Sequence, residues 1–354
     1  MRQNYTPLLI LMTAFLLTGG ANAADLYKKG TTDFKPVSLP KSGEIQALEV
    51  TPKQITLQGI DDAAQLLLTA KLKTSRLQDL TEDVEYSVAN AKVANVTSSG
   101  RVVPVGNGTT EITATYQGLT TKISVKCESC DVNLPINFGN EIVPIFTKLG
   151  CNSGGCHGKA SGQNGFKLSL LGFEPDVDYN ALVKEARGRR LFPAAPERSL
   201  LLMKAIGEIA HGGGKRMERD SDEYRLIRRW IASGTPFGKP DDPKVTRISV
   251  TPERRTLTRH NKQQFAVYAH YSDGSVQDIT RRAQYESNDK EIAVVDEKAL
   301  VHTLDLSGEA AIMVRYQSQV AVFRATVPLG VKIPSYDFKQ FTMVDQYTHE
   351  KWQE

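Results

Sequence analysis

The chain has 354 residues, of which 40% are hydrophobic and 24% are charged. These are ordinary globular proportions, and they exclude a disordered chain, a collagen and a disulfide-rich mini-protein. A chain of this length is expected to form two or three domains with separate cores. The net charge is only +4, but residues 134–239 hold 16 Lys and Arg against 11 Asp and Glu. The middle of the chain is therefore its basic part, although it lacks the motifs that would make nucleic acid a partner.

The amino terminus has the pattern of a secretory signal peptide. Arg2 precedes an apolar run from Leu8 to Leu17, and Ala21-Asn22-Ala23 forms a small-x-small cleavage site. The run is much shorter than the roughly 20 residues that span a bilayer. We therefore predict that residues 1–23 are a cleaved signal and that the mature chain is exported, to the periplasm or the cell surface, with no membrane span.

Two segments of the chain repeat one order of motifs, 199 or 200 residues apart. Val50-Thr51-Pro52 recurs as Val250-Thr251-Pro252, and Asp79-Leu80-Thr81 recurs as Asp278-Ile279-Thr280. Both segments alternate apolar and polar positions in short β-branched runs, which is the pattern of half-buried strands. The two segments are therefore copies of one all-β module.

The order of these motifs resembles the bacterial Ig-like domain, group 2, of surface and periplasmic proteins. The resemblance implies a β-sandwich over residues 44–128 and a second one over residues 245–328. It also implies that both act as spacer or adhesive modules, in contact with a cell surface or a polysaccharide.

Between the two copies the residue pattern becomes helical. Apolar residues recur at helical spacing from Ile142 to Leu149, after Asn140 as a candidate N-cap. Residues 220–234 begin with a capping-box pattern and place Trp230 and Ile231 on one apolar face. We therefore expect a helix at each end of this middle segment.

The middle segment also contains Cys151, Cys156 and His157 in one short stretch. Two cysteines followed directly by a histidine are the pattern of c-type haem attachment, although the usual gap between the cysteines is two residues and here it is four. With the flanking helices, the segment 136–238 resembles a cytochrome c domain. The resemblance implies an all-α domain with one haem c bound covalently to Cys151 and Cys156, with His157 as the proximal iron ligand. It further implies one-electron transfer to a redox partner protein.

Two residues compete for the role of distal iron ligand, and a third alternative is a site that is open or holds water. The resemblance implies Met217, which lies shortly before the last expected helix, although Glu218 follows it where the family usually has proline. His211 is the alternative, because the three glycines after it allow the backbone to approach a cofactor closely. The two residues imply different redox potentials, since thioether ligation raises the potential.

The remaining cysteines, Cys127 and Cys130, are followed by Asp131 and cannot form a second haem motif. In an exported protein we expect them to form a short-loop disulfide. Two alternatives use all four cysteines: a pair of plain disulfides, or a structural zinc site with four thiolate ligands.

The predicted fold is thus two all-β Ig-like sandwiches flanking an all-α cytochrome c-like domain. Residues 336–354 look like the start of a further domain, because the whole order resembles large exported bacterial proteins with uncharacterised carboxyl-terminal domains; those domains are further candidate partners. The predicted function is that of a haem-binding electron carrier that is not itself an enzyme. The alternative is a non-redox adhesion or scaffold protein of the cell surface whose cysteines form disulfides.

Overall fold

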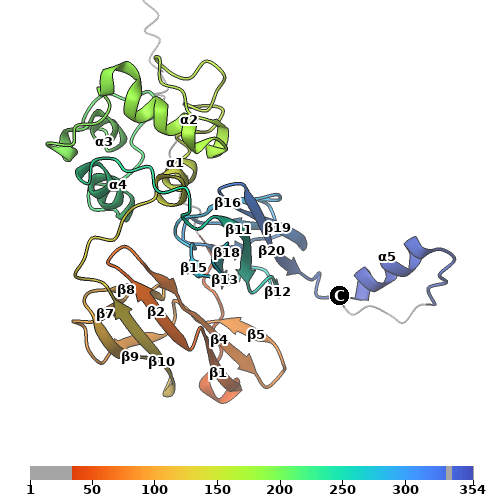
Figure 1. Cartoon of the computed structure of the whole chain (residues 1–354). Coiled ribbons are helices and arrows are strands. Elements are labelled where there is room, and N and C mark those ends of the chain that lie inside the picture. Colours follow the sequence, from red (N-terminus) through yellow and green to blue (C-terminus); the bar gives the residue numbers. More distant parts are fainter. Residues whose placement is uncertain (1–33, 332–336, 354) are drawn as a thin grey trace, which may run out of the picture.

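The computed structural model describes residues 34–331 and 337–353. The described part consists of two β-sandwiches, a middle region that lies between them in the chain, and the helix α5 (Met343–Gln353) (Figure 1). The predicted signal peptide lies outside the described residues. No helix among the described residues has the length and apolar character that are needed to cross a membrane.

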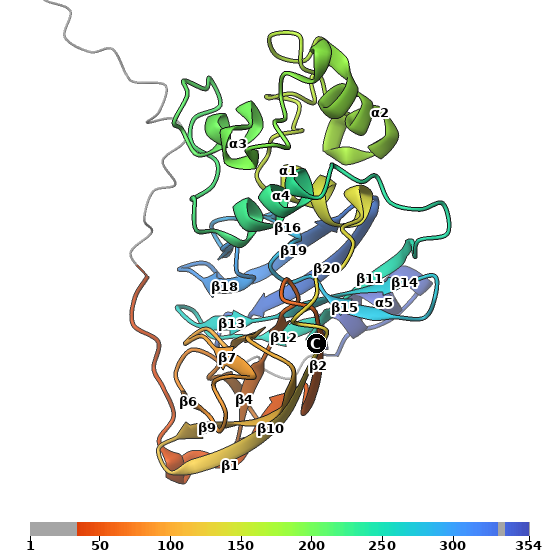
Figure 2. The ribbon, with the colours of Figure 1, turned by 60° about the vertical axis from the view of Figure 1, so that its left-hand side comes forward.

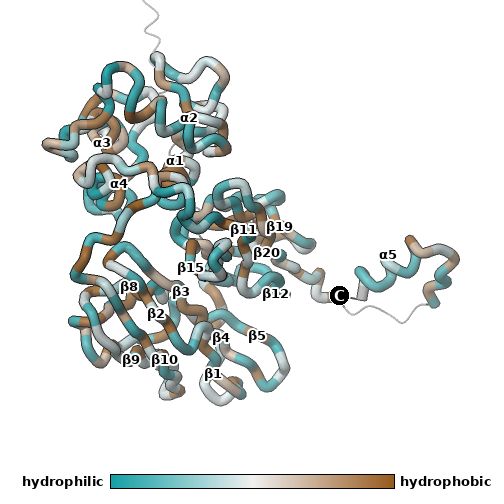
Figure 3. Tube along the Cα trace, in the orientation of Figure 1, coloured by the Kyte–Doolittle hydropathy of each residue, from teal (hydrophilic) through white to brown (hydrophobic). Residues whose placement is uncertain are grey.

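The first sandwich contains three sheets with the strand orders β1-β4-β5, β2-β10-β9-β6 and β3-β8-β7. Its strands alternate in hydropathy along their length (Figure 3), and the inward side chains form a core that includes Leu57, Ile112 and Ile123. Alternation with a period of two places every second side chain on the same face of a strand, which is why these segments pack as a sandwich. The strands are β1 (Ile45–Thr51), β2 (Gln54–Gln58), β3 (Ala64–Gln65), β4 (Leu67–Leu72), β5 (Leu77–Asp79), β6 (Glu85–Val88), β7 (Ala94–Val96), β8 (Arg101–Pro104), β9 (Gly108–Tyr116) and β10 (Leu119–Glu128).

The second sandwich repeats the first strand for strand. Its sheets have the orders β11-β14-β15, β12-β20-β19-β16 and β13-β18-β17. Each sandwich has one parallel pair, β10 with β2 and β20 with β12. The all-β part of the predicted fold is confirmed. The strands are β11 (Val245–Thr251), β12 (Arg254–Thr256), β13 (Lys262–Gln264), β14 (Ala266–Tyr271), β15 (Val276–Asp278), β16 (Gln284–Ser287), β17 (Ala293–Val295), β18 (Leu300–Thr303), β19 (Gly308–Tyr316) and β20 (Gln319–Val327).

The middle region, residues 136–238, is not the predicted all-α domain. It contains α1 (Val143–Lys148), α2 (Pro175–Tyr179), α3 (Leu200–Ala205) and α4 (Asp222–Ala232), and most of the rest is turns and irregular loops. Glycines with positive φ, such as Gly162 and Gly172, interrupt the chain between the first two helices. Such positions end helices, and helices this short are held by packing and not by their own cooperativity. The longest of these helices, α4, has 11 residues, and turns and loops make up most of the region, so the prediction of an all-α cytochrome c-like domain is wrong.

The two ends of the middle region lie together. Phe138 donates its backbone N–H to Phe237 O at 3.0 Å, and its ring contacts Trp230, with the ring centroids 5.3 Å apart. Trp230 is fully buried, and its Nε1 donates to Pro236 O at 2.8 Å. Since the chain enters and leaves the middle region at one place, the two sandwiches that flank it can both lie on the same side of it (Figures 1 and 2).

Candidate functional site

The two sandwiches are joined by a matched pair of hydrogen bonds. Asp79, at the end of β5, accepts from the backbone N–H of Gln264 at 2.8 Å, and Asp278, at the end of β15, accepts from the backbone N–H of Gln65 at 2.7 Å. Gln264 and Asp278 each lie 199 residues after Gln65 and Asp79. Equivalent residues therefore exchange roles across the contact, as in an interface with two-fold symmetry. We call this contact the interlock.

Each carboxylate of the interlock is also anchored inside its own sandwich. The Thr81 hydroxyl donates to Asp79 at 2.6 Å and accepts from the backbone N–H of Leu68 at 3.0 Å. The backbone N–H of Thr280 donates to Asp278 at 2.8 Å. Burial raises the pKa of Asp79 to about 6 and also raises the pKa of Asp278. The repeated Asp-x-Thr motif thus shapes a turn and joins the sandwiches, and sequence reasoning recognised it only as a mark of repetition.

Next to the interlock, the two sandwiches carry opposite charges. Glu82-Asp83 of the first sandwich correspond to Arg281-Arg282 of the second, 199 residues later. Lys262 crosses the contact and lies 3.1 Å from Asp83 and 3.5 Å from Glu82. The residue equivalent to Lys262 in the first sandwich is Ala63. The acidic pair therefore meets a cation across the contact, whereas the basic pair meets no charge at the equivalent position.

The two arginines of the basic pair differ in how their charge is compensated. Burial opposes the charge of Arg282, but its electrostatic interactions with Tyr316, Glu141 and Asp62 outweigh burial and raise its pKa. Arg281 donates to Gln65 Oε1 and to Ser99 Oγ, both at 3.0 Å. No described carboxylate forms an ion pair with Arg281. Burial lowers its pKa and the neighbouring Arg101 lowers it further, and the smaller opposing effects of Asp296, Tyr285 and Asp278 do not offset this.

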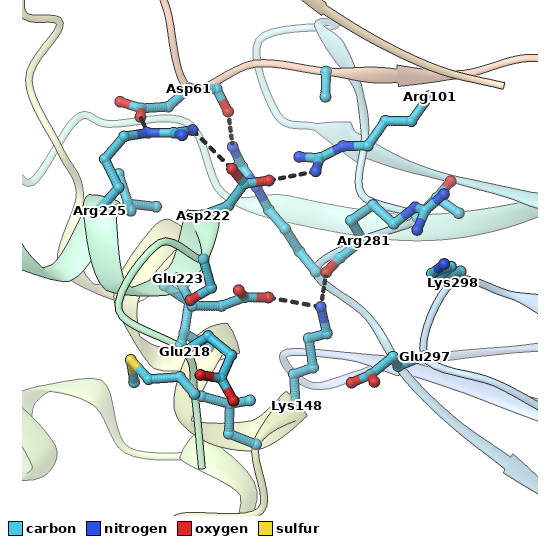
Figure 4. Close-up of a pocket in the computed structure, with 18 of the residues that line it drawn as sticks. Asp61, Arg101, Lys148, Glu218, Asp222, Glu223, Arg225, Arg281, Glu297 and Lys298 are labelled. Carbon is cyan, nitrogen blue, oxygen red and sulfur yellow. Dashed lines mark hydrogen bonds and ion pairs between the residues drawn. The ribbon is translucent and has the colours of Figure 1, made fainter. Parts of the chain in front are cut away.

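A cleft of about 730 Å³ opens where the middle region meets both sandwiches. Figure 4 shows Arg101, Arg281 and Lys298 along one side of it and the amino end of α4, with Asp222 and Glu223, on the other. Asp222 pairs with Arg101 and with Arg225, and Glu223 pairs with Lys148 at 2.8 Å. Lys148 also donates to Arg281 O at 2.5 Å. These contacts dock the middle region on the joined sandwiches.

Arg225 and Arg229 of α4 make a second bridge to the first sandwich. Both pair with Asp61, which lies in the loop between β2 and β3. Arg229 also donates to Leu134 O at 2.7 Å. Asp61 in turn accepts, through its backbone carbonyl, from Arg282 of the second sandwich at 3.0 Å. One loop therefore contacts all three parts of the molecule.

A separate cavity of about 460 Å³ lies inside the middle region. Cys151, Cys156, His157 and His211 all line it, so the structure brings together the predicted cysteine, histidine and alternative distal residues. The rings of His157 and His211 are nearly parallel, with their centroids 6.2 Å apart. Met217 does not line this cavity. It is 7% exposed and belongs to the core of the middle region, where it borders the cleft between the middle region and the two sandwiches, which we call the three-part cleft.

Both imidazoles of this cavity are fixed through one nitrogen. His157 Nδ1 lies 3.0 Å from Phe166 O, and His211 Nδ1 lies 2.9 Å from Gly214 O. Because a carbonyl only accepts, each Nδ1 carries the proton of a neutral ring and each Nε2 keeps its lone pair. Burial lowers the pKa of His157, which keeps this imidazole neutral at pH 7.

All four cysteines are free thiols in the structure. Burial raises the pKa of Cys151 to about 12 and the pKa of Cys127 to about 11. Cys127 is buried on β10, and its thiol hydrogen-bonds with that of Cys130. The predicted disulfide between Cys127 and Cys130 stays a prediction. Among the described residues no three or more Cys, His, Asp or Glu side chains are grouped to hold a metal ion, so the alternative of a four-cysteine zinc site is wrong.

Comparison with known families gives a match over the second sandwich. Residues 244–321 match the bacterial Ig-like domain (group 2), which confirms the predicted family for this copy. The first sandwich has the same strand order. No curated protein matches the chain.

Among solved structures, the chain is similar to domains 5–6 of the S-layer protein SbsC, with 12% identity, coverage of 80% of this chain and 98% of that chain, and a TM-score of 0.31. It is similar to invasin, a bacterial integrin-binding protein, with 12% identity, coverage of 82% and 40%, and a TM-score of 0.17. It is also similar to human protocadherin-24 EC1-2, with 9% identity, coverage of 82% and 100%, and a TM-score of 0.17. Likenesses this distant support no conclusion about function.

The prediction of a covalent haem c is wrong. It depended on a cytochrome c-like domain, whereas the family that matches is the bacterial Ig-like domain (group 2), over residues 244–321, and no three or more Cys, His, Asp or Glu side chains of the described residues are grouped to hold a metal ion. The four-residue gap between Cys151 and Cys156 and the short, interrupted helices around them are departures from the cytochrome c pattern. The predictions of electron transfer, of bound iron and of a redox partner protein all depended on the haem, so they are wrong as well.

Proposed function

We propose that this protein is an exported scaffold of the bacterial cell surface, without catalytic activity of its own. The observation that carries the proposal is the interlock, because it joins two Ig-like sandwiches into one unit. Flexibly linked modules would leave their orientation to the linker. Here the orientation is specified by buried carboxylates, and the middle region is docked on both sandwiches by Lys148, Arg225 and Arg229. Such a unit suits a spacer that holds a surface contact at a fixed distance.

Surface labelling of intact cells tests this proposal. The full chain, produced with its own amino-terminal signal, is treated with a biotin reagent that cannot cross membranes, and the labelled fraction is compared before and after the outer envelope is opened. We expect labelling of intact cells. Labelling only after lysis of the whole cell would contradict an exported scaffold, and labelling only after opening of the outer envelope would contradict its surface position.

In the oxidising compartment we propose that the cysteines form two disulfides, Cys127 with Cys130 and Cys151 with Cys156. The side chains of the first pair already contact each other, and those of the second pair line one cavity. Alkylation of the exported protein with and without reductant, followed by mass spectrometry, tests both pairs. We expect alkylation at all four positions only after reduction. Alkylation of Cys151 and Cys156 without reductant would contradict the second pair.

A further inference from the structure

The unequal charges beside the interlock identify a candidate ligand site. In the first sandwich the acidic pair is neutralised by Lys262. In the second sandwich the equivalent pair is basic, and Arg281 faces the cleft with only the neutral partners Gln65 and Ser99 for its guanidinium. A cation that is partly buried without a carboxylate partner is costly in an isolated protein, and a bound anion would remove that cost.

Two further cations lie on the same side of the cleft. Arg101 comes from β8, and its charge affects that of Arg281 directly. Lys298 comes from the turn between β17 and β18, is exposed, and forms no ion pair with a described residue. The Nε atoms of Arg101 and Arg281 are both buried without a hydrogen-bond partner. Neighbouring guanidinium groups offer donors in the planar arrangement that oxyanions accept.

The carboxylates in the cleft only partly neutralise this side of it: Glu297 and Asp278 lie there, and Asp278 already accepts from the backbone N–H groups of Gln65 and Thr280. Asp222 is shared between Arg101 and Arg225, and Glu223 is held by Lys148. Both belong to α4, which Figure 4 shows opposite Arg281 and Lys298. Glu297 lies next to Lys298 in the same turn, so an anion placed between Arg281, Arg101 and Lys298 would meet three cations and, besides Asp278, one carboxylate on its own side.

We propose that the three-part cleft binds an acidic saccharide through one of its carboxylate or sulfate groups, which lies between Arg281, Arg101 and Lys298. A volume of about 730 Å³ is that of a small-molecule site and is larger than a bare inorganic oxyanion requires. The identification of a saccharide rests on the proposed surface function. The oxyanion group itself rests only on the charges in the cleft. Because the ligand touches both sandwiches, binding also stabilises the joined form.

Isothermal titration calorimetry of the full mature chain with trigalacturonate tests the proposal, with inorganic sulfate and a neutral trisaccharide as separate arms. We expect trigalacturonate to bind and the neutral trisaccharide not to bind. Arg281→Gln is expected to weaken binding about 10-fold, through loss of a charge-assisted contact. Lys298→Gln is expected to weaken it about 3-fold, because exposed ion pairs contribute little. Arg247→Gln, which changes an exposed arginine of β11 outside the cleft, is the matched control.

The separate titrations distinguish an error in the proposed binding site from an error in the proposed surface function. Equal binding of the acidic and neutral saccharides, or equal binding by wild type and Lys298→Gln, would overturn the proposal even if Arg281→Gln failed to fold. Binding of sulfate but not of trigalacturonate would overturn the saccharide and leave a site for a free ion. Surface labelling of intact cells is independent of all these results.

Discussion

The two sandwiches share one topology, yet they differ at the residues that surround their contact. Both have the same three sheets, and both contribute one glutamine and one aspartate to the interlock. The first then presents Glu82-Asp83 and the second Arg281-Arg282. The comparison teaches that the buried hydrogen bonds specify how the copies pair, whereas the partly exposed charges beside them are free to diverge. One side of the contact is neutralised, and the other is left positive toward a cleft.

Removal of either interlock carboxylate is expected to have the largest effect. Asp79→Ala leaves the backbone N–H of Gln264 and the hydroxyl of Thr81 without their acceptor, and we expect a loss of about 3 kcal/mol in the free energy of unfolding. Asp278→Ala should lose a similar amount. Urea denaturation measures both. The control is Asp273→Ala, which removes an exposed turn carboxylate, and an equal loss in the control would refute the special role of the interlock.

The charges beside the interlock should respond unequally to removal. Lys262→Ala is expected to cost about 2 kcal/mol, because it leaves the partly buried Asp83 without its ion-pair partner. Arg281→Gln should cost less, about 1 kcal/mol in a buffer without oxyanions, since it loses hydrogen bonds to the neutral Gln65 and Ser99 but no ion pair. Both are measured by urea denaturation in chloride buffer. Equal losses would show that Arg281 is compensated as well as Lys262.

The two sandwiches also differ at one position beside the interlock, which is Gly100 in the first and Ala299 in the second. Gly100 has φ +74°, and a Cβ there would lie 2.8 Å from Thr81 Cγ2 and 2.9 Å from the Tyr86 hydroxyl. The second sandwich has Ala299 at this position, also with positive φ. We expect Gly100→Ala to cost about 1.5 kcal/mol, because it displaces a threonine that is tied to Asp79. Ala299→Gly should cost less than about 0.5 kcal/mol in thermal denaturation. A harmless Gly100→Ala would show that Thr81 can move without loosening the interlock.

The sequence predicted those features that depend on local pattern. Alternation with a period of two and the recurrence of Val-Thr-Pro and Asp-x-Thr predicted both sandwiches. The capping pattern before α4 predicted a helix whose N-cap, Ser221, indeed accepts from the backbone N–H of Tyr224 at 3.2 Å. The all-α middle domain failed because two helical ends were extended by resemblance over a glycine-rich interior.

The interlock and the cleft could not be predicted in the same way. They depend on how two complete sandwiches and the middle region pack, and no residue pattern within one copy contains that information. A residue-by-residue alignment of the two copies does reveal the exchange of Glu82-Asp83 for Arg281-Arg282. The sequence shows that the charges differ, but only the fold shows that both pairs border one contact. The proximity of His157 and His211 was not predictable either, because the two residues lie in segments that share no motif.

The smallest expected effect is a dependence of stability on pH. Asp79 has a pKa of about 6 in the folded protein, against an ordinary value of 3.8, so folding favours its protonated form. Its contribution to stability is therefore complete below the ordinary value and is lost as the pH rises through 6. Between pH 7 and pH 5 we expect the wild type to gain about 1 kcal/mol relative to Asp79→Asn, whose amide does not titrate. Urea denaturation at both pH values measures this difference.

Asp278 complicates this measurement, because burial raises its pKa too. The double variant Asp79→Asn/Asp278→Asn removes both titrations, and its stability should change less between the two pH values than that of either single variant. Lys262 lies across the contact from Asp79, whereas Glu82 and Asp83 belong to the same sandwich as Asp79, and all three remain in all variants. If wild type and double variant had parallel pH profiles, the carboxylates would be ionised in the joined sandwiches. The interlock would then be held by charge and not by the protonated form.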